Sequence, residues 1–426
     1  MPGRRLAGLL VWLVVAVFAV PATAQEPDPA LRGRAEQLVA LVNGEAPVET
    51  MFSPEFLAQV PAAQVRAIGE ALRTQYGRAE AVDRIEPASA TAATVLIRTE
   101  RATLRMNLAI QPQPPHLVQG LLVAGAEMRG DSLAAIAAEI TALPGQAAFA
   151  VARLGEGAPE ILAAHRAETP LAIGSAFKLW VLAEIARQAT AGERRWNEVV
   201  PLDRRSLPSG ILQAWPQGSP LTVHTLAGLM ISISDNTATD ILLDLAGRRN
   251  VERMLGTIGG AAATRNRPFL STLHAFALKA APEPTYRAWR EAGEDARRRM
   301  LSEDPSLAGA GLDPGRFGTA PTRLDVEWFA SPADLVRTMD WLRRSGGDEA
   351  LALLAISPGL PSPAASELAY IGYKGGSEPG VLNLTWLVRN RAGSWHVVTG
   401  SWNDPAAPLQ EARFGELMRR AIQLVS

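Results

Sequence analysis

The segment Gly174-Ser175-Ala176-Phe177-Lys178, followed at once by Leu179-Trp180-Val181-Leu182-Ala183, places a serine and a lysine at the start of an apolar run. The run predicts a buried helix with Ser175 in its first turn. Residues three positions apart share one face of a helix, so the hydroxyl of Ser175 and the amine of Lys178 are predicted to lie within hydrogen-bond reach.

This pair has a chemical interpretation and a plainer structural one. A desolvated lysine can lose its charge and accept the proton of a serine, and the positive end of a helix favours negative charge on an attacked carbonyl oxygen. The segment therefore predicts Ser175 as a nucleophile with Lys178 as its base. Taken alone, it also fits a serine N-cap followed by an ordinary lysine.

Lysine is rare in this chain, which makes its positions informative. Of the 42 basic side chains only Lys178, Lys279 and Lys374 are lysines. Arginine keeps its proton in proteins, so chemistry that needs a neutral amine must retain lysine. The 42 basic side chains nearly cancel the 43 acidic ones, so overall charge indicates neither a nucleic-acid partner nor an anionic membrane.

Two further motifs follow in order. Ser234-Asp235-Asn236 precedes a predicted helix over 237–245, and Lys374-Gly375-Gly376-Ser377 closes a predicted strand over 368–374. With Ser175-x-x-Lys178 they resemble the class A β-lactamases and penicillin-binding proteins, whose motifs are Ser-x-x-Lys, Ser-Asp-Asn and Lys-Thr-Gly. The resemblance covers residues 131–426 and implies a serine β-lactamase-like fold.

The resemblance also implies a role for each catalytic candidate. Ser175 would be acylated, Lys178 would be its base or proton relay, and Ser234 would pass a proton to the leaving group. Lys374 would lie across the cleft, where its charge lowers the pKa of the first lysine and attracts a substrate carboxylate.

Four positions are implied to bind substrate. Asn236 would hydrogen-bond the substrate and the lysine, and the backbone N–H of Ser377 would complete an oxyanion hole with that of the nucleophile. Gly375 and Gly376 belong to the third motif. Gly375 stands where the family has a hydroxyl side chain that binds a carboxylate, a role for which Ser377 could substitute.

The chain also departs from the class A pattern between the second and third motifs. No Glu-x-x-Leu-Asn string is present there, and the segment is longer than in the family, with the extra length predicted between 280 and 322. Glu303, Asp325 and Glu327 are candidates for activating a deacylating water, or else solvated surface groups. The missing glutamate predicts slow deacylation.

The N-terminus carries an export pattern. Arg4 and Arg5 precede an apolar run from Leu6 to Val20, and Ala22-Thr23-Ala24 has the spacing of a signal peptidase site. Residues 1–24 are therefore predicted to be a cleavable signal, a retained membrane anchor being the alternative. We expect a periplasmic or secreted protein without stable membrane insertion, and the lack of cysteine excludes a structural disulfide and a thiol nucleophile.

Patterns along the chain predict two α+β domains. Residues 25–125 run from a helical pattern over 54–76 to four alternating segments, at 79–85, 90–98, 102–110 and 117–123. A linker is expected over 124–132. Residues 131–426 have strands at both ends and a helical middle, which predicts one antiparallel sheet interrupted by an inserted helical region.

A smaller resemblance concerns a branch of the same family. Arg267-Pro268-Phe269-Leu270-Ser271-Thr272 and Trp328-Phe329-Ala330-Ser331 are similar to a branch with an extra N-terminal domain, found in clavulanic acid gene clusters. In that branch the front domain is a cone like those of steroid isomerases and cyclases.

Together these patterns predict an exported serine hydrolase that acts on a small β-lactam, peptide or ester substrate. They imply no metal and no organic cofactor. The alternative is a penicillin-recognising or peptidoglycan-binding sensor that is acylated without turnover.

Overall fold

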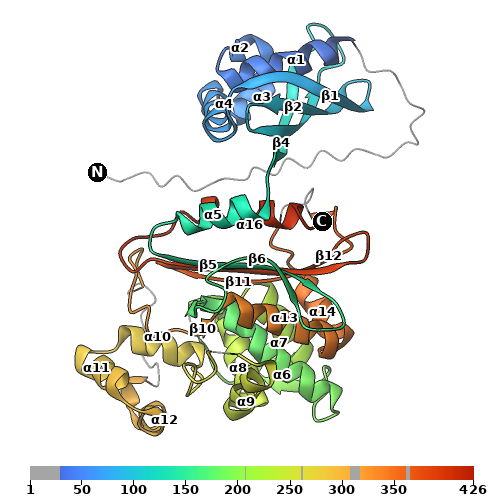
Figure 1. Ribbon diagram of the computed structural model, residues 1–426. Helices are drawn as coiled ribbons and strands as arrows, with labels where there is room; N and C mark the ends of the chain where they lie inside the picture. The colour runs from blue at the N-terminus through green and yellow to red at the C-terminus, as the bar shows by residue number, and fades with distance from the viewer. Residues whose placement is uncertain (1–28, 207, 261, 308–316, 361–364) are drawn as a thin grey trace. The chain divides into compact units, whose positions relative to one another are not determined.

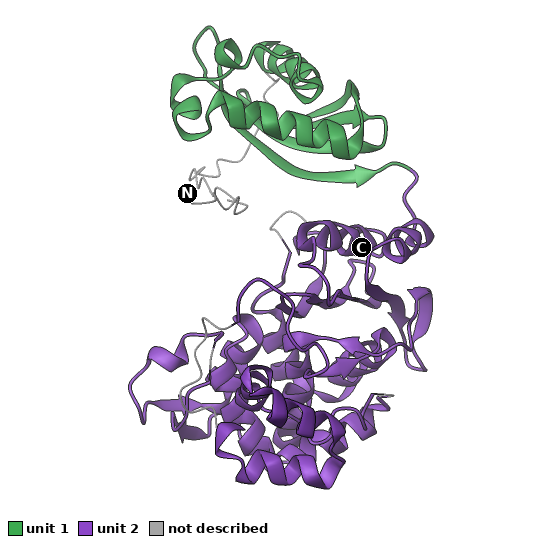
Figure 2. Ribbon diagram, turned by 90° about the vertical axis from the view of Figure 1, so that its left-hand side faces the viewer, with its two compact units in different colours: residues 1–129 green, residues 130–426 purple. Residues whose placement is uncertain are grey.

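The computed structural model describes residues 29–426 except 207, 261, 308–316 and 361–364, so the predicted signal lies outside the described residues. The chain divides into two compact units, residues 1–129 and 130–426 (Figure 2). Strand β4 (Val118–Met128) runs through most of the segment 124–132, so the linker predicted there was wrong in its extent. Gly125 follows a register shift in β4, where a bulge bends the strand without ending it.

The first unit is a set of helices followed by a four-stranded antiparallel sheet in the order β1-β2-β3-β4 (Figure 1). Its other elements are α1 (Pro29–Asn43), α2 (Val48–Met51), α3 (Pro54–Gln59), α4 (Ala62–Tyr76), β1 (Ala79–Ser89), β2 (Ala92–Thr99) and β3 (Ala102–Ile110). The helical pattern over 54–76 forms two helices, because Pro61 disfavours helical geometry at the residue before it.

The second unit is built on a five-stranded antiparallel sheet in the order β11-β12-β13-β5-β6. Its strands are β5 (Gln146–Leu154), β6 (Glu160–His165), β11 (Tyr370–Glu378), β12 (Val381–Arg389) and β13 (Trp395–Asn403). The late strand β13 pairs with the early strand β5, which confirms the prediction of one sheet interrupted by an inserted helical region.

Helices cover both faces of this sheet. On one face lie α5 (Leu133–Thr141) and α16 (Glu411–Gln423), and on the other lies the inserted helical region (Figure 1). α16 buries the apolar side chains Phe414, Leu417, Met418 and Ile422. None of the helices in the described parts of the chain has the length and apolar character needed to cross a membrane.

The inserted region begins after the short strand β7 (Leu171–Ala172) and consists mainly of helices. They are α6 (Lys178–Thr190), α7 (Val223–Ser232), α8 (Asn236–Ala246), α9 (Arg248–Ile258), α10 (Thr272–Ala280), α11 (Glu283–Glu291), α12 (Glu294–Glu303), α13 (Pro332–Ser345) and α14 (Gly347–Ala355). Two small pairings complete it: β7 with β10 (Phe329–Ala330), and β8 (Val199–Pro201) with β9 (Pro220–Thr222).

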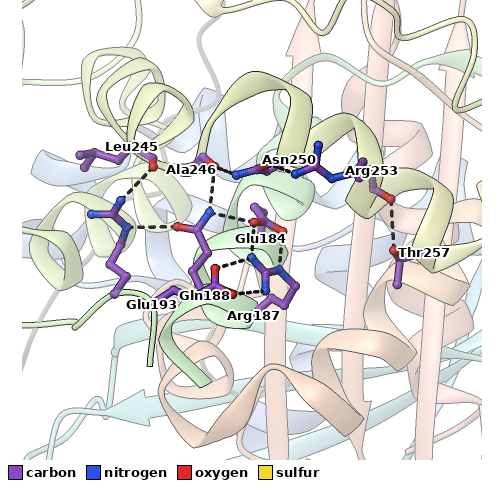
Figure 3. Close-up of polar contacts among 10 residues, drawn as sticks. Glu184, Arg187, Gln188, Glu193, Leu245, Ala246, Asn250, Arg253 and Thr257 are labelled. Carbon is purple, nitrogen blue, oxygen red and sulfur yellow. Dashed lines mark hydrogen bonds and ion pairs between the residues drawn. The ribbon is translucent and has the colours of Figure 1, made fainter. Parts of the chain in front are cut away.

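A polar network holds the C-terminal ends of α6 and α8 together (Figure 3). The buried carboxylate of Glu184 accepts two hydrogen bonds from Arg187, both of 2.9 Å. Gln188 donates to Glu184 at 2.8 Å and to the carbonyl oxygen of Ala246 at 2.8 Å. The C-terminal ends of α6 and α8 therefore lie together. Their N-terminal ends also lie together, because Lys178 donates a hydrogen bond to Asn236. The two helices thus run in parallel, and the positive ends of both dipoles point to one place.

Candidate active site

Ser175 lies in a 3₁₀ turn, Gly174–Phe177, that leads directly into α6. The serine is therefore one turn ahead of the α-helix and not inside it, because Gly174 has a φ of 49° that starts the turn. Ser175 is half-buried, whereas Ala176 and Phe177 are fully enclosed. The first N–H groups of such a turn have no partner within the helix, so they are available to an anionic oxygen.

Lys178 is fully buried and its amine is saturated with hydrogen bonds. Its Nζ donates to the carbonyl oxygen of Ser234 at 2.7 Å, to Ser234 Oγ at 2.9 Å and to Asn236 Oδ1 at 2.7 Å. Among the hydrogen bonds of the described residues, none joins Lys178 to Ser175. Before Lys178 can receive the proton of Ser175, its amine must lose one of these three hydrogen bonds or one of the protons that it donates in them.

Lys374 reaches Ser234 from the sheet. Its Nζ donates to Ser234 Oγ at 3.1 Å and to the carbonyl oxygen of Gly375 at 2.7 Å. The hydroxyl of Ser234 thus accepts hydrogen bonds from both Lys178 and Lys374. One atom links the three motifs, which come from the 3₁₀ turn and α6, the α7–α8 loop and β11.

The backbone around Ser234 is held in an uncommon conformation. Ser234 has a φ of 59°, in the left-handed region that costs energy for a residue with a side chain. Asp235 compensates by fixing its neighbours, since its carboxylate accepts from the backbone N–H groups of Ile211 at 2.7 Å, Leu212 at 3.0 Å and Ala238 at 2.8 Å. The last of these bonds also caps the N-terminus of α8.

Burial makes both amines of the site weaker bases. The pKa of Lys178 lies well below its ordinary value, chiefly because the amine is desolvated and secondly because Lys374 is positive, while Asp240 and Asp235 offset part of the effect. Desolvation lowers the pKa of Lys374 to about 7. The lowered pKa makes the neutral amine, which a general base requires, more accessible at Lys178.

The third motif lies inside β11, since the strand continues to Glu378 instead of ending at residue 374 as predicted. Side chains alternate along a strand, so Lys374 and Gly376 share one face and Gly375 and Ser377 the other. A Cβ at Gly376 would overlap the carbonyl oxygen of Ile173 and the backbone nitrogen of Ser175. Only glycine allows β11 to approach the nucleophile turn this closely.

Gly375 and Ser377 differ in their surroundings. A Cβ at Gly375 would overlap the phenol oxygen of Tyr373 and would lie 3.0 Å from the carbonyl oxygen of Asn383. Tyr373 thus occupies the space of a hydroxyl side chain at position 375. Ser377 is exposed, and a Cβ on Gly174 would lie 3.2 Å from its backbone nitrogen, so that N–H lies beside the nucleophile turn.

The matching family was found by comparison with protein-family models. Residues 132–345, half of the 426-residue chain, match the model described as the beta-lactamase enzyme family. The chain belongs to the beta-lactamase enzyme family. The match spans the first two motifs and ends before β11, which carries the third.

Solved structures with a similar fold include beta-lactamases from two bacteria. The Sphaerobacter thermophilus enzyme is 22% identical over 68% of this chain and 96% of its own, with a TM-score of 0.48. The Chitinophaga pinensis enzyme is 17% identical over 69% of this chain and 98% of its own, with a TM-score of 0.47. PBP-A is 18% identical over 69% and 93%, with a TM-score of 0.46. No curated protein matches the chain.

A buried ionic cluster beside the site of this beta-lactamase-family protein was not foreseen. Lys279 on α10 forms an ion pair with Glu327 at 3.0 Å and a hydrogen bond to the carboxyl group of Glu378 at the end of β11. The side chains of Lys279 and Glu327 are only 2% and 3% exposed, so Glu327 is not the surface group offered as an alternative. The sequence signal for this cluster was Lys279, since it is one of only three lysines in a chain rich in arginine.

The other two carboxylate candidates lie in more open positions. Glu303 is exposed at the end of α12, and the carboxylate of Asp325 accepts hydrogen bonds from the hydroxyl of Tyr286 at 2.7 and 2.8 Å. In the described parts of the chain, no group of three or more His, Cys, Asp or Glu side chains is arranged to hold a metal ion.

The cluster predicts a pH dependence of stability. Desolvation, followed by the charge of Glu327, raises the pKa of Glu378 to about 8, against ~4.3 in an unfolded chain. Between these values the folded state binds more protons, so the free energy of unfolding should fall as pH rises, by at most ~1.4 kcal/mol per pH unit. Denaturant unfolding of Glu378→Gln between pH 5 and 8 should show a flatter profile than wild type.

The exposed Glu303 provides the matched control for this measurement. Glu303→Gln should keep the wild-type pH profile, because its carboxylate is solvated. A Glu378→Gln profile as steep as that of wild type would show that another group carries the proton.

Proposed function

We propose that the chain is a serine hydrolase in which Ser175 forms an acyl-enzyme with Lys178 as its base. The observation that carries the proposal is the single hydroxyl of Ser234 that accepts from both Lys178, at 2.9 Å, and Lys374, at 3.1 Å. This contact joins all three motifs into one path for protons, from the buried amine of Lys178 to the half-buried hydroxyl of Ser234.

The proposed acylation transfers one proton in two stages. Oγ of Ser175 attacks the substrate carbonyl carbon while its proton passes to the neutral amine of Lys178. The developing oxyanion is stabilised by the backbone N–H groups of Ser175 and Ser377. As the scissile bond breaks, Ser234 delivers a proton to the leaving group and is reprotonated from Lys178.

Hydrolysis of the ester bond to Ser175 completes the cycle. A water attacks the acyl carbon, Ser175 regains its proton, and a carboxylic acid leaves. Asn236 and Lys374 are proposed to bind the substrate amide and carboxylate, and the lack of a Glu-x-x-Leu-Asn string favours slow deacylation. Membership of the beta-lactamase family supports a hydrolase over a sensor that is acylated without turnover.

Intact-protein mass spectrometry tests the proposal directly. The purified protein would be exposed to benzylpenicillin and, separately, to the activated ester p-nitrophenyl acetate, with Ser175→Ala treated in parallel. We expect an adduct of the acyl group's mass on wild type only, and its loss over hours as product is released. An adduct that persists would identify the sensor, and the same adduct on Ser175→Ala would reject the nucleophile.

Export is proposed on the N-terminal pattern alone. Removal of residues 1–24 should leave Gln25, or a near neighbour, as the first residue of the protein recovered from the periplasm or medium of the native host. N-terminal sequencing would measure this. An intact Met1 in the membrane fraction would instead identify a retained anchor.

On the evidence of its first unit, we also propose that the chain belongs to the branch of the family that has an extra N-terminal domain. Its support is the order of elements in residues 29–128, where four helices precede a four-stranded antiparallel sheet, as in a steroid-isomerase-like or cyclase-like cone.

A further inference from the structure

A cavity lies in the family domain, and α11 and α12 build one of its walls. It measures about 280 Å³, and it is not lined by Ser175, Lys178, Ser234 or Lys374. One wall comes from Trp289 and Arg290 of α11 and Arg297 of α12, and the others come from residues 265–270 and 325–329.

Arginine dominates the charge of this cavity. Four guanidinium groups line it, those of Arg265, Arg267, Arg290 and Arg297, against the carboxylates of Asp325 and Glu327. Both carboxylates already have cationic partners. Arg290 pairs with Asp325 at 2.9 Å, and Glu327 pairs with Lys279 at 3.0 Å.

The remaining three arginines have no carboxylate partner among the described residues. Nε of Arg267 is buried without a hydrogen-bond acceptor. Arg265 lies over the ring of Phe329, 3.5 Å from its centroid, and Arg297 donates only to carbonyl oxygens, of Trp289 at 3.0 Å and Arg290 at 3.2 Å. Partial burial lowers the pKa of Arg265 and of Arg297, and the charge of Asp325 offsets this only in part. Partly buried cations that lack an ion pair of their own are stabilised when an anion joins them.

The walls are held in place before any ligand arrives. Asn266 donates to the carbonyl oxygen of Phe329 at 2.8 Å and accepts from its N–H at 2.9 Å. The indole of Trp328 donates to the carbonyl oxygen of Leu270 at 3.1 Å. Trp289, Trp328, Phe329 and Leu270 complete the lining, and each is almost fully buried.

We propose that this cavity binds a small carboxylate-bearing molecule, at a site separate from the Ser175 site. The three guanidinium groups that lack an ion pair match carboxylate oxygens. The wall of the cavity also contacts the nucleophile turn, since Trp328 stacks on Phe177 with ring centroids 3.7 Å apart.

The test uses cyclohexane-1,2-dicarboxylate as the probe and its neutral diamide as the matched control. Calorimetry and tryptophan fluorescence on the full chain should show one equivalent of dicarboxylate bound, and the diamide at least about tenfold weaker. Arg267→Gln and Arg297→Gln, each checked for an unchanged melting temperature, should weaken binding by a similar factor. Arg287→Gln, exposed on α11 and outside the cavity, should bind as wild type does.

Ser175→Ala should bind the dicarboxylate as wild type does, which separates this site from the proposed chemistry. Absence of binding at millimolar probe, equal binding of the diamide, tighter binding of inorganic phosphate, or undiminished binding by both arginine variants would each overturn the proposal.

Discussion

Replacing Ser175 by alanine should reduce hydrolysis of any accepted substrate by about 10³-fold or more and abolish the acyl adduct, because no other group then forms the covalent bond. Stability should hardly change. No hydrogen bond of the Ser175 hydroxyl is present among the described residues, so its loss should shift the melting temperature by no more than a few degrees. Steady-state rates and a thermal melt of the same preparation would measure both effects.

Ser232 offers the control for this experiment. It is half-buried like Ser175, lies two residues before Ser234, and its hydroxyl donates to the carbonyl oxygen of Gly228 at 2.6 Å. Ser232→Ala should therefore retain hydrolysis at close to the wild-type rate. Wild-type activity in Ser175→Ala would reject the nucleophile, and equal losses in both variants would point to a general effect on the fold.

Local patterns predicted the elements that carry the motifs. The apolar run after Lys178 forms α6, and the helix predicted over 237–245 is α8, Asn236–Ala246. These predictions succeeded because period and capping are properties of neighbouring residues. The same reasoning joined 54–76 into one helix, where Pro61 separates two.

Contacts between residues that are distant in the chain could not be predicted from the sequence. Glu327 pairs with Lys279, 48 positions away in the chain, and nothing near Glu327 distinguishes a buried carboxylate from a solvated one. The space around Gly375 depends on the orientation of Tyr373, which the strand pattern does not specify. Motif order placed the candidates in one family, whereas the hydrogen bonds of Lys178 required the folded chain.

Lys178 and Lys374 are predicted to respond differently to the same substitution. Lys178→Arg should remove acylation, because a guanidinium keeps its proton at any working pH and cannot accept that of Ser175. Lys374→Arg should retain part of the activity, since its proposed role needs only positive charge and a hydrogen bond to Ser234. Lys374→Ala should lose more than Lys374→Arg.

The buried position of Lys178 makes a control for packing necessary. A larger guanidinium in its place can cost ~1–3 kcal/mol of stability, which alone could mimic a catalytic loss. Lys279 is also buried and lies outside the proposed chemistry, so Lys279→Arg carries a comparable packing cost and should still be acylated.

Stopped-flow acylation by a fluorescent penicillin or an activated ester would be recorded for each folded variant, with product release followed over hours. The proposed mechanism requires that Lys178→Arg, at a melting temperature close to that of Lys279→Arg, shows no acylation while Lys279→Arg and Lys374→Arg do. That result would show that position 178 must supply a neutral amine, because Lys279→Arg and Lys374→Arg make the same substitution at other buried lysines. Undiminished acylation in Lys178→Arg would mean that another residue takes the proton of Ser175, and the mechanism would have to be abandoned.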